Sequence, residues 1–368
     1  PPSGGDQMRN RVLESQFSDI GMAAGFLAMN IGKRSLGLDI KSEKGKEILF
    51  ALIKKSDVIL HNFRAGVVDR LGLDYDSVRA INPSIVYTVI SGFGAKGPRS
   101  ADPAYDGAVQ AAAGMMANNG TAESGPLRTG YMPVDLMTGM TAAYATTAAL
   151  LRKQKTGKGQ MVDVAMLDCA ITLGSANFSR SEVDDIPDML IGNQSITSAP
   201  TASSFPTAEG AILTAAIMPN HVEAFFDEIG LKEMLNDPKF ATREARIENK
   251  EIVRDAMIEA LKSDTAENWE KRLAPRGVPV AKINSVKETA RLEQLQYRNI
   301  LTAVPAAKGM ANGYRLPGAP FTNSEDGPEV MRPAPVLGQH TLEILEEIGI
   351  DKSVINTLAA EGVICKAD

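Results

Sequence analysis

The chain has 368 residues, of which 44% are hydrophobic and 23% charged, a composition typical of a soluble globular protein long enough for two domains. Its formal net charge of −6 argues against general nucleic-acid binding, and no apolar run approaches the roughly 20 residues that a membrane helix needs. Two cysteines, Cys169 and Cys365, are too few for a disulfide framework or a four-cysteine zinc site, so we expect a reducing, cytoplasmic setting and no metal.

The first half of the chain alternates short apolar runs with amphipathic segments. The predicted strands are 34–40, 57–63, 84–91 and 160–167, and the predicted helices are 44–56, 75–82 and 135–154. Strands this apolar, alternating with helices, indicate a parallel sheet covered on both faces, which is an α/β fold. The helix over 135–154 is the clearest, and one stripe of it carries Leu136, Met140, Tyr144, Thr147 and Leu151.

The second half changes in texture. Residues 180–205 are polar, contain prolines and show little periodicity, which predicts a linker. A smaller region follows, with a strand over 210–217 and helices near 220–230, 242–262 and 265–274. The last of these should be capped by Asp264 or Thr265. From about 290 the chain turns irregular again, and two helices, 340–349 and 352–362, finish it.

The sequence gives little support for a dinucleotide-binding loop or for a histidine-based metal or catalytic site. The segment "GFGAKG" (92–97) has the letters G-x-G-x-x-G after a predicted strand, but Pro98 and Pro103 prevent a helix from opening at once, as a dinucleotide fingerprint requires. A glycine loop whose backbone approaches a ligand closely is favoured, and a nucleotide-dependent oxidoreductase is a distant alternative. The three histidines are scattered and lack the spacing of metal ligands or of a base beside a nucleophile: His61, His221 and His340.

Basic residues gather near the ends of the early strands: Lys33, Arg34, Lys41, Arg64, Arg70, Lys96 and Arg99. Ligands of open α/β sheets bind beyond the carboxyl ends of the strands. The segment "HNFRAGVVDR" (61–70) places four candidates just past such an end: Asn62, Phe63, Arg64 and Arg70. Asn can hydrogen-bond an adenine edge, Phe can pack on its face and Arg can hold phosphate. A solvated basic surface is the alternative interpretation.

Asp135 stands at the head of the predicted helix 135–154, after Met-Pro-Val. An aspartate at a helix start is a favoured N-cap, worth about 1 kcal/mol. Its neighbours in sequence are largely apolar, so the carboxylate would be poorly hydrated yet kept ionised by the helix dipole. Such a carboxylate is a usable nucleophile toward an activated acyl group. The residues alone leave both interpretations open.

Taken together, these segments resemble the family III CoA-transferases, over almost the whole chain. The resemblance is carried by ordered blocks that include "NIGKRSLGLDIKSEKGKEIL", "HNFRAGVVDRLGLDYDSVRAINPSIVYTVISGFGAKGP", "PAYDGAVQAAAG", "VDLMTGMTAAYATTAALLRKQKTGKGQMVDVAMLD" and "APVLGQHTLEILEEIG". It implies a large Rossmann-like domain formed by both chain ends, a smaller inserted α+β domain and an interlocked homodimer. The expected limits are 1–185, a linker 186–205, the small domain 206–290, a linker 291–320 and the C-terminal part 321–368.

The resemblance also implies an activity and a site. Asp135 aligns with the catalytic aspartate, and the CoA-contacting positions fall on Leu38, Lys41, Asn62, Phe63, Arg70 and Met166. The implied reaction moves CoA, a substrate rather than a tightly bound cofactor, from an acyl-CoA to a small carboxylic acid through aspartyl-anhydride and aspartyl-CoA intermediates. A possible substrate or oxyanion region comprises Gly92, Phe93, Gly94, Tyr105 and Arg128, and Arg128 with Arg99 mildly favours a dicarboxylate such as succinate.

Two departures from related patterns bear on these expectations. The α-methylacyl-CoA racemases use the histidine of a Gly-His-Asp motif as acid and base, whereas this chain has Ala104-Tyr105-Asp106 there, so a transferase is favoured over the racemase alternative. Family members also begin with an additional strand and helix before the segment matching "PPSGGDQMR". Their absence predicts that the sequence is a piece of a longer protein.

Overall fold

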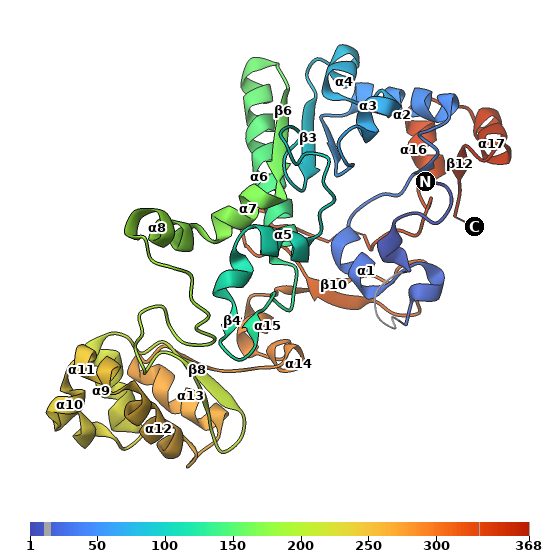
Figure 1. Cartoon of the computed structure of the whole chain (residues 1–368). Coiled ribbons are helices and arrows are strands. Elements are labelled where there is room, and N and C mark those ends of the chain that lie inside the picture. The colour runs from blue at the N-terminus through green and yellow to red at the C-terminus, as the bar shows by residue number, and fades with distance from the viewer. Residues whose placement is uncertain (11–15, 331, 368) are drawn as a thin grey trace. The chain divides into compact units, whose positions relative to one another are not determined.

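Contacts divide the chain into two units, which the computed structural model describes over residues 1–10, 16–330 and 332–367 (Figure 1). Unit 1 comprises Pro1–Ala104, Leu136–Cys169 and Ala290–Asp368, and unit 2 comprises Tyr105–Asp135 and Ala170–Thr289. The boundary passes through the first turn of one long helix. The domain limits expected from the sequence stay a prediction.

The central feature of unit 1 is a three-stranded parallel sheet in the order β2-β3-β6, which confirms the predicted parallel α/β arrangement. Its strands are β2 (Val58–His61), β3 (Val86–Ser91) and β6 (Gln160–Ala165). The sheet's middle strand begins with four buried residues, because it has a paired neighbour on each side. Helix α2 (Glu43–Lys55) precedes β2. Helices α3 (Val67–Leu71) and α4 (Tyr75–Ile81) lie between β2 and β3 in the sequence, and α5 (Asp106–Ala112) and α6 (Pro133–Thr156) lie between β3 and β6.

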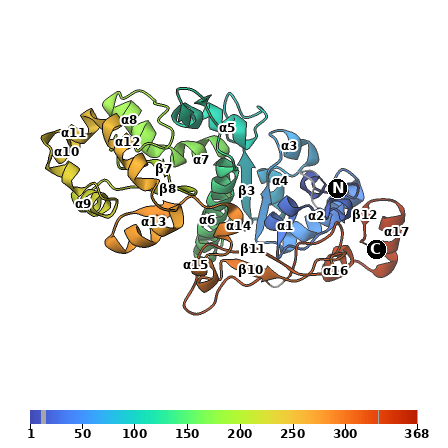
Figure 2. The ribbon, with the colours of Figure 1, turned by 90° about the horizontal axis from the view of Figure 1, so that it is seen from below.

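Helix α6 packs mainly small residues against the sheet, together with the partly buried Met137. Figure 2 shows α6 beside β3, and the hydroxyls of Thr88 and Thr146 lie 2.7 Å apart. Ala142 and Ala149 are buried on the same side of the helix. The predicted stripe of large residues is exposed instead, with Met140 60% and Tyr144 65% exposed. An amphipathic helix normally turns its large apolar residues to the core, so this face is unusual.

The strand predicted over 34–40 is wrong in extent and in pairing. Strand β1 covers only Gly37–Leu38 and pairs antiparallel with β12 (Ile364–Cys365) instead of joining the parallel sheet. Side-chain hydrogen bonds reinforce this pairing, because Thr341 Oγ1 accepts the N–H of Gly37 and donates to the carbonyl of Cys365. A strand specified by a partner more than 300 residues away leaves only a weak local signal.

The rest of unit 1 includes a hairpin that the sequence did not predict. Strands β10 (Leu301–Val304) and β11 (Tyr314–Pro317) pair antiparallel inside the segment expected to be an irregular linker. Gly309, at φ +86°, lies in the reversal between them. The remaining helices that lie in unit 1 in whole or part are α1 (Ala24–Asn30), α7 (Met166–Leu173), α15 (Glu293–Tyr297), α16 (Thr341–Glu347) and α17 (Lys352–Ala360). The last two confirm the predicted C-terminal helices.

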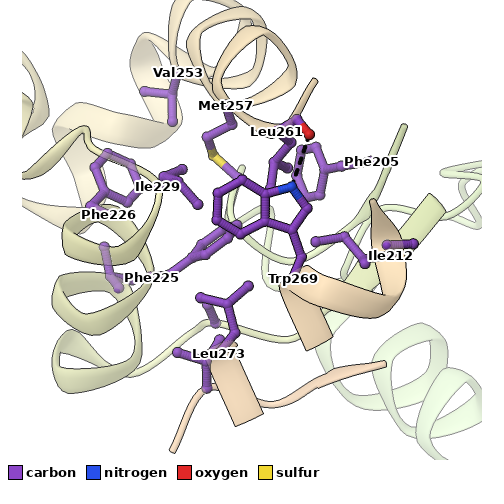
Figure 3. Packing of buried hydrophobic residues seen from close by; sticks show 14 of the residues in the cluster. Phe205, Ile212, Phe225, Phe226, Ile229, Val253, Met257, Leu261, Trp269 and Leu273 are labelled. Atoms are coloured by element: carbon purple, nitrogen blue, oxygen red, sulfur yellow. Dashed lines mark hydrogen bonds between the residues drawn. The ribbon is translucent and has the colours of Figure 1, made fainter. Parts of the chain in front are cut away.

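Unit 2 is built around Trp269, which is 3% exposed and donates its indole N–H to the carbonyl of Leu261 at 2.9 Å (Figure 3). Phe225, Met257 and Leu273 belong to the same buried cluster. An antiparallel sheet, β7-β8-β9, completes the core, and the elements of this region are β7 (Ser204–Pro206), β8 (Ala211–Thr214), α9 (Pro219–Glu228), α10 (Pro238–Ala241), α11 (Arg243–Glu248), α12 (Lys250–Leu261), α13 (Ala266–Leu273), β9 (Val280–Lys282) and α14 (Val286–Thr289).

Two expectations about unit 2 need correction and one is confirmed. The single helix predicted over 242–262 is divided at Asn249, whose ψ of 31° leaves the helical region and whose side-chain amide donates to the carbonyls of Lys239 and Ala245. The linker predicted from 180 begins later, because α8 (Ser175–Asp184) continues into it. Thr265 caps α13 as predicted, accepting the N–H of Asn268. Across the described residues, no helix is long and apolar enough to cross a membrane.

Candidate active site

Asp135 is the third residue of α6 and lies at the surface of the described chain. Among the residues that the structure describes, none donates a hydrogen bond to its carboxylate or forms an ion pair with it. Although the residue is exposed, surrounding protein atoms displace part of the carboxylate's hydration. This desolvation, and then the negative charge of Asp106, raise the pKa of Asp135 above its usual value. The carboxylate is therefore uncommitted and more basic than an ordinary aspartate.

The start of α6 is capped by Asp106, a residue from the first turn of α5. Asp106 is 6% exposed, and its Oδ2 accepts the backbone N–H groups of Val134 at 2.9 Å and Asp135 at 3.0 Å. These are N–H groups that a helix start leaves without intrahelical partners. The expectation that Asp135 caps its own helix is therefore corrected. Another carboxylate performs this task, and the side chain of Asp135 takes no part in the cap.

A buried glutamine ties Asp106 to the segment that leads into α6. Gln110 is 1% exposed, and its Nε2 donates to Asp106 Oδ1 at 2.5 Å and to Thr129 Oγ1 at 3.0 Å. Its Oε1 accepts the N–H of Thr129 at 3.0 Å, and Thr129 Oγ1 donates to the carbonyl of Tyr131. This network fixes residues 129–135 against α5, so the backbone that carries Asp135 is rigidly placed.

Two further predicted residues lie in unit 2. Tyr105 precedes α5 and is 69% exposed. Arg128 is exposed, passes close to Gly107 in the first turn of α5, and has no ion-pair partner within the described ranges. A cavity of about 430 Å³ also lies in this unit, between the α5 region and α8, and its lining includes Gln110, Asn118 and Thr129. No described lysine or arginine lines this cavity.

The predicted CoA-contacting residues divide into an exposed set and a buried set. Asn62 and Phe63 follow β2 directly and are exposed, Phe63 by 41%. Lys41 and Arg70 are also exposed, and neither has an ion-pair partner in the part of the chain that the structure describes. Two members pack into the interior instead: Leu38, 6% exposed, and Met166, 8% exposed.

A cation-lined cavity in unit 1 was not identified from the sequence. It has a volume of about 240 Å³ and is lined by Arg9, Lys33 and Arg34 together with Phe26 and Pro335. Arg9 is buried against the Phe26 ring at 3.9 Å and donates to the carbonyl of Pro335 at 3.0 Å. Its Nε has no partner among the described atoms, and burial lowers the pKa of this guanidinium. Pro335 lies 326 residues further along the chain, so no local pattern announces the cavity.

The glycine loop at 92–97 opens no helix, as predicted. The N–H of Gly94 donates to Ser91 Oγ at 3.0 Å, and the N–H of Ala95 donates to the carboxylate of Asp163. The Gly94 amide is thus already engaged within the loop. Arg99 is engaged as well, because its guanidinium stacks 3.9 Å above the Phe93 ring and its Nε donates to Asp102.

Comparison with known proteins shows which family the chain matches. A family model described as CoA-transferase family III matches residues 1–341. The chain belongs to CoA-transferase family III. It is 30% identical to succinate–glutarate CoA-transferase of Agrobacterium fabrum, over 94% of this chain and 87% of that protein. It is 32% identical to formyl-CoA:oxalate CoA-transferase of Streptomyces coelicolor, over 92% of this chain and 86% of that protein.

A solved structure supports the same assignment. The CAIB/BAIF family protein from Brucella suis superposes with a TM-score of 0.80 at 28% identity, covering 89% of this chain and 84% of that one.

The histidines of this family III member are not grouped as metal ligands. The Nδ1 atoms of His61 and His340 each accept a hydrogen bond from a backbone N–H. Within the described ranges, no three His, Cys, Asp or Glu side chains come together as a metal site.

Proposed function

We propose that the protein transfers CoA from an acyl-CoA to a carboxylic acid, with Asp135 as the covalent nucleophile. The observation that carries this proposal is the Asp135 carboxylate, which has no bonding partner among the described residues while Asp106 caps its helix. The relatives in CoA-transferase family III bear names that describe CoA transfer to oxalate, glutarate or mesaconate. A carboxylate with a raised pKa is also a stronger nucleophile, since basicity and nucleophilicity rise together.

The proposed reaction has two exchanges at the carboxyl group of Asp135. An oxygen of Asp135 attacks the thioester carbonyl of the donor and the C–S bond breaks. CoA leaves as a thiolate, and the acyl group stays on Asp135 as a mixed anhydride. The thiolate then attacks Cγ of Asp135 and expels the donor acid, which gives an aspartyl-CoA thioester. The acceptor carboxylate repeats both steps in reverse. A thiolate retained through its nucleotide returns quickly because of its high effective concentration.

The nucleotide part of CoA is proposed to bind unit 1. The exposed Phe63 ring offers a face for adenine and Asn62 an amide for its edge, while Lys41 and Arg70, without ion pairs in the described part of the chain, offer charges for the phosphates. The cavity that contains Arg9 adds a buried guanidinium with an unpartnered Nε among the described atoms, which also suits phosphate oxygens. Leu38 and Met166 would contribute backbone atoms and packing.

A dicarboxylate is the proposed acceptor class. Arg128 has no ion pair within the described residues and can bind a second carboxylate, whereas Arg99 is already paired with Asp102. Tyr105 stands at the position where a racemase would need an imidazole base, so proton exchange beside the thioester lacks one catalyst. A panel of oxalate, succinate, glutarate and their monocarboxylate analogues, followed by mass spectrometry of the CoA products, tests this choice. Equal rates with monocarboxylates would remove the role of Arg128.

We also propose that two copies form a homodimer through α6. The exposed stripe of Leu136, Met140, Tyr144 and Leu151 is the kind of apolar surface that a protein partner normally covers. Sedimentation analysis of the wild type and of Met140→Glu measures this directly. A monomeric wild type would end the dimer proposal.

The variant Asp135→Asn tests the mechanism. A carboxyl group with a raised folded-state pKa binds more protons folded than unfolded, so it lowers stability as the pH rises through that window. Asn removes this effect and leaves the Asp106 cap intact, so the variant should be at least as stable as the wild type at neutral pH and yet transfer no CoA. Hydroxylamine added during turnover should modify Asp135 of the wild type. Transfer by Asp135→Asn at the wild-type rate would refute the nucleophile.

A further inference from the structure

His61 ends strand β2, one residue before the Asn62–Phe63 pair. The N–H of Phe63 donates to His61 Nδ1 at 3.2 Å, and His61 Nε2 lies 2.9 Å from the Tyr87 hydroxyl. The Phe63 ring also stacks on the imidazole, with centroids 5.7 Å apart and planes inclined by 29°. His61 therefore contacts both the backbone and the ring of the residue proposed to carry adenine.

These contacts define one protonation state of His61. The Tyr87 hydroxyl donates to the carbonyl of Leu73 at 2.6 Å, since that oxygen can only accept. The same hydroxyl must then accept a hydrogen from His61 Nε2. Because Nδ1 accepts the Phe63 N–H, it carries no hydrogen itself. The ring is thus neutral, with its hydrogen on Nε2.

The surroundings of His61 preserve this state. Burial, followed by the negative charges of Asp74 and Asp69, raises the pKa of Tyr87 to about 12, so its hydroxyl keeps its hydrogen and stays directed at Leu73. Burial lowers the pKa of His61. Tyr87 is the titratable residue of β3 that contacts the imidazole, and the ring of Tyr87 in turn contacts Tyr75. No described carboxylate counteracts the effect of burial on the pKa of His61.

We propose that His61 is a positioning residue that holds Phe63 in place for the adenine of CoA only while its imidazole is neutral. The inference rests on the CoA-binding role proposed for Asn62 and Phe63. Protonation puts a hydrogen on Nδ1, opposite the Phe63 N–H, and two donors cannot bond to each other. The backbone bond is then lost and the ring of Phe63 is released. CoA binding therefore weakens as the pH falls.

Calorimetric titration with CoA from about pH 8 to about pH 5 measures this effect, because the range includes the ordinary histidine pKa of about 6.5 and the lower values toward which burial moves the pKa of His61. Over this pH range, the affinity of the wild type for CoA should fall about five- to tenfold more than the affinity of His61→Asn. This difference corresponds to the loss of one hydrogen bond. His61→Asn is the matched comparison, because its amide oxygen keeps an acceptor for the Phe63 N–H and its side chain cannot titrate. His61→Phe keeps a ring on Phe63 but has no acceptor, so it should bind CoA weakly at every pH.

The structural part of the inference has its own readout. Nitrogen-15 NMR of the wild type should show His61 Nδ1 without hydrogen and Nε2 with it, and a hydrogen on Nδ1 would overturn the inference. If His61→Phe binds CoA with the affinity and pH dependence of the wild type while Phe63→Ala binds more weakly, the inference is also overturned. If Phe63→Ala binds CoA as the wild type does, the failure lies in the proposed CoA site instead. Thermal unfolding of each variant establishes that it is folded.

Discussion

Replacing Asp106 with Asn tests the capping of α6 and the electrostatics of Asp135 together. Asp106 accepts two helix N–H groups at Oδ2 and one from Gln110 at Oδ1. An Asn side chain has one neutral oxygen and an NH₂ group, so if the oxygen keeps the helix N–H groups, the NH₂ faces the Gln110 donor. A hydrogen bond to a charged group stabilises by about 1.5 to 3 kcal/mol and a neutral one by about 1 kcal/mol. Weakening two such bonds and losing one should lower the free energy of unfolding by about 3 kcal/mol.

Urea unfolding followed by circular dichroism measures this loss. Asp102→Asn is the matched control, because Asp102 is exposed and its ion pair with Arg99 contributes at most about 1 kcal/mol. The negative charge of Asp106 raises the pKa of Asp135, so removing it lowers that pKa. The acid limb of the transfer rate should then move to lower pH. A stability loss no larger than that of Asp102→Asn, or an acid limb that moves to higher pH, would refute the reasoning.

Three further predictions concern binding and packing. Arg70→Gln should raise the Kd for CoA about tenfold and flatten its salt dependence, measured by calorimetry at two ionic strengths, whereas Lys262→Gln, an exposed residue paired within its helix turn, should not. Leu273→Ala should lower the free energy of unfolding by about 2 to 5 kcal/mol, against less than about 0.5 for the exposed Ile252→Ala; equal urea midpoints would contradict the packing in Figure 3. Gly159→Ala places a methyl group against a backbone carbonyl and should cost about 3 kcal/mol, visible as a lower Tm; an unchanged Tm would show that the backbone yields there.

Local periodicity explains which elements could be predicted. The apolar residues of helix α2 recur with the 3.6-residue period of a helix, and strand β3 is a continuous apolar run. Both patterns lie within a short stretch of sequence. Strand β1 lacks such a pattern, because its partner β12 follows more than 300 residues later. The division of the helix predicted over 242–262 depends on a side-chain contact that periodicity does not reveal, since the Asn249 amide donates to the carbonyl of Lys239, ten residues earlier in α10.

The site shows the same division between local and non-local information. Asp135 could be singled out because its apolar neighbours in sequence already imply weak hydration. The task of Asp106 could not, because an aspartate at the start of α5 gives no sign that it caps a different helix. Arg9 is similar, since its meaning depends on Phe26 and Pro335 closing around it. A residue whose role depends on its sequence neighbours can be identified from the sequence, whereas a residue whose role depends on contacts made in the folded chain cannot.

The pairing of β1 with β12 constrains the order in which the chain can mature on the ribosome. Gly37 is made more than 300 residues before its partner Cys365, so this corner of unit 1 must wait until Cys365 has left the ribosome. The cluster around Trp269 draws on residues 205–278 and can assemble while later codons are still being read. The middle of the chain is thus able to become native before the segment that precedes it.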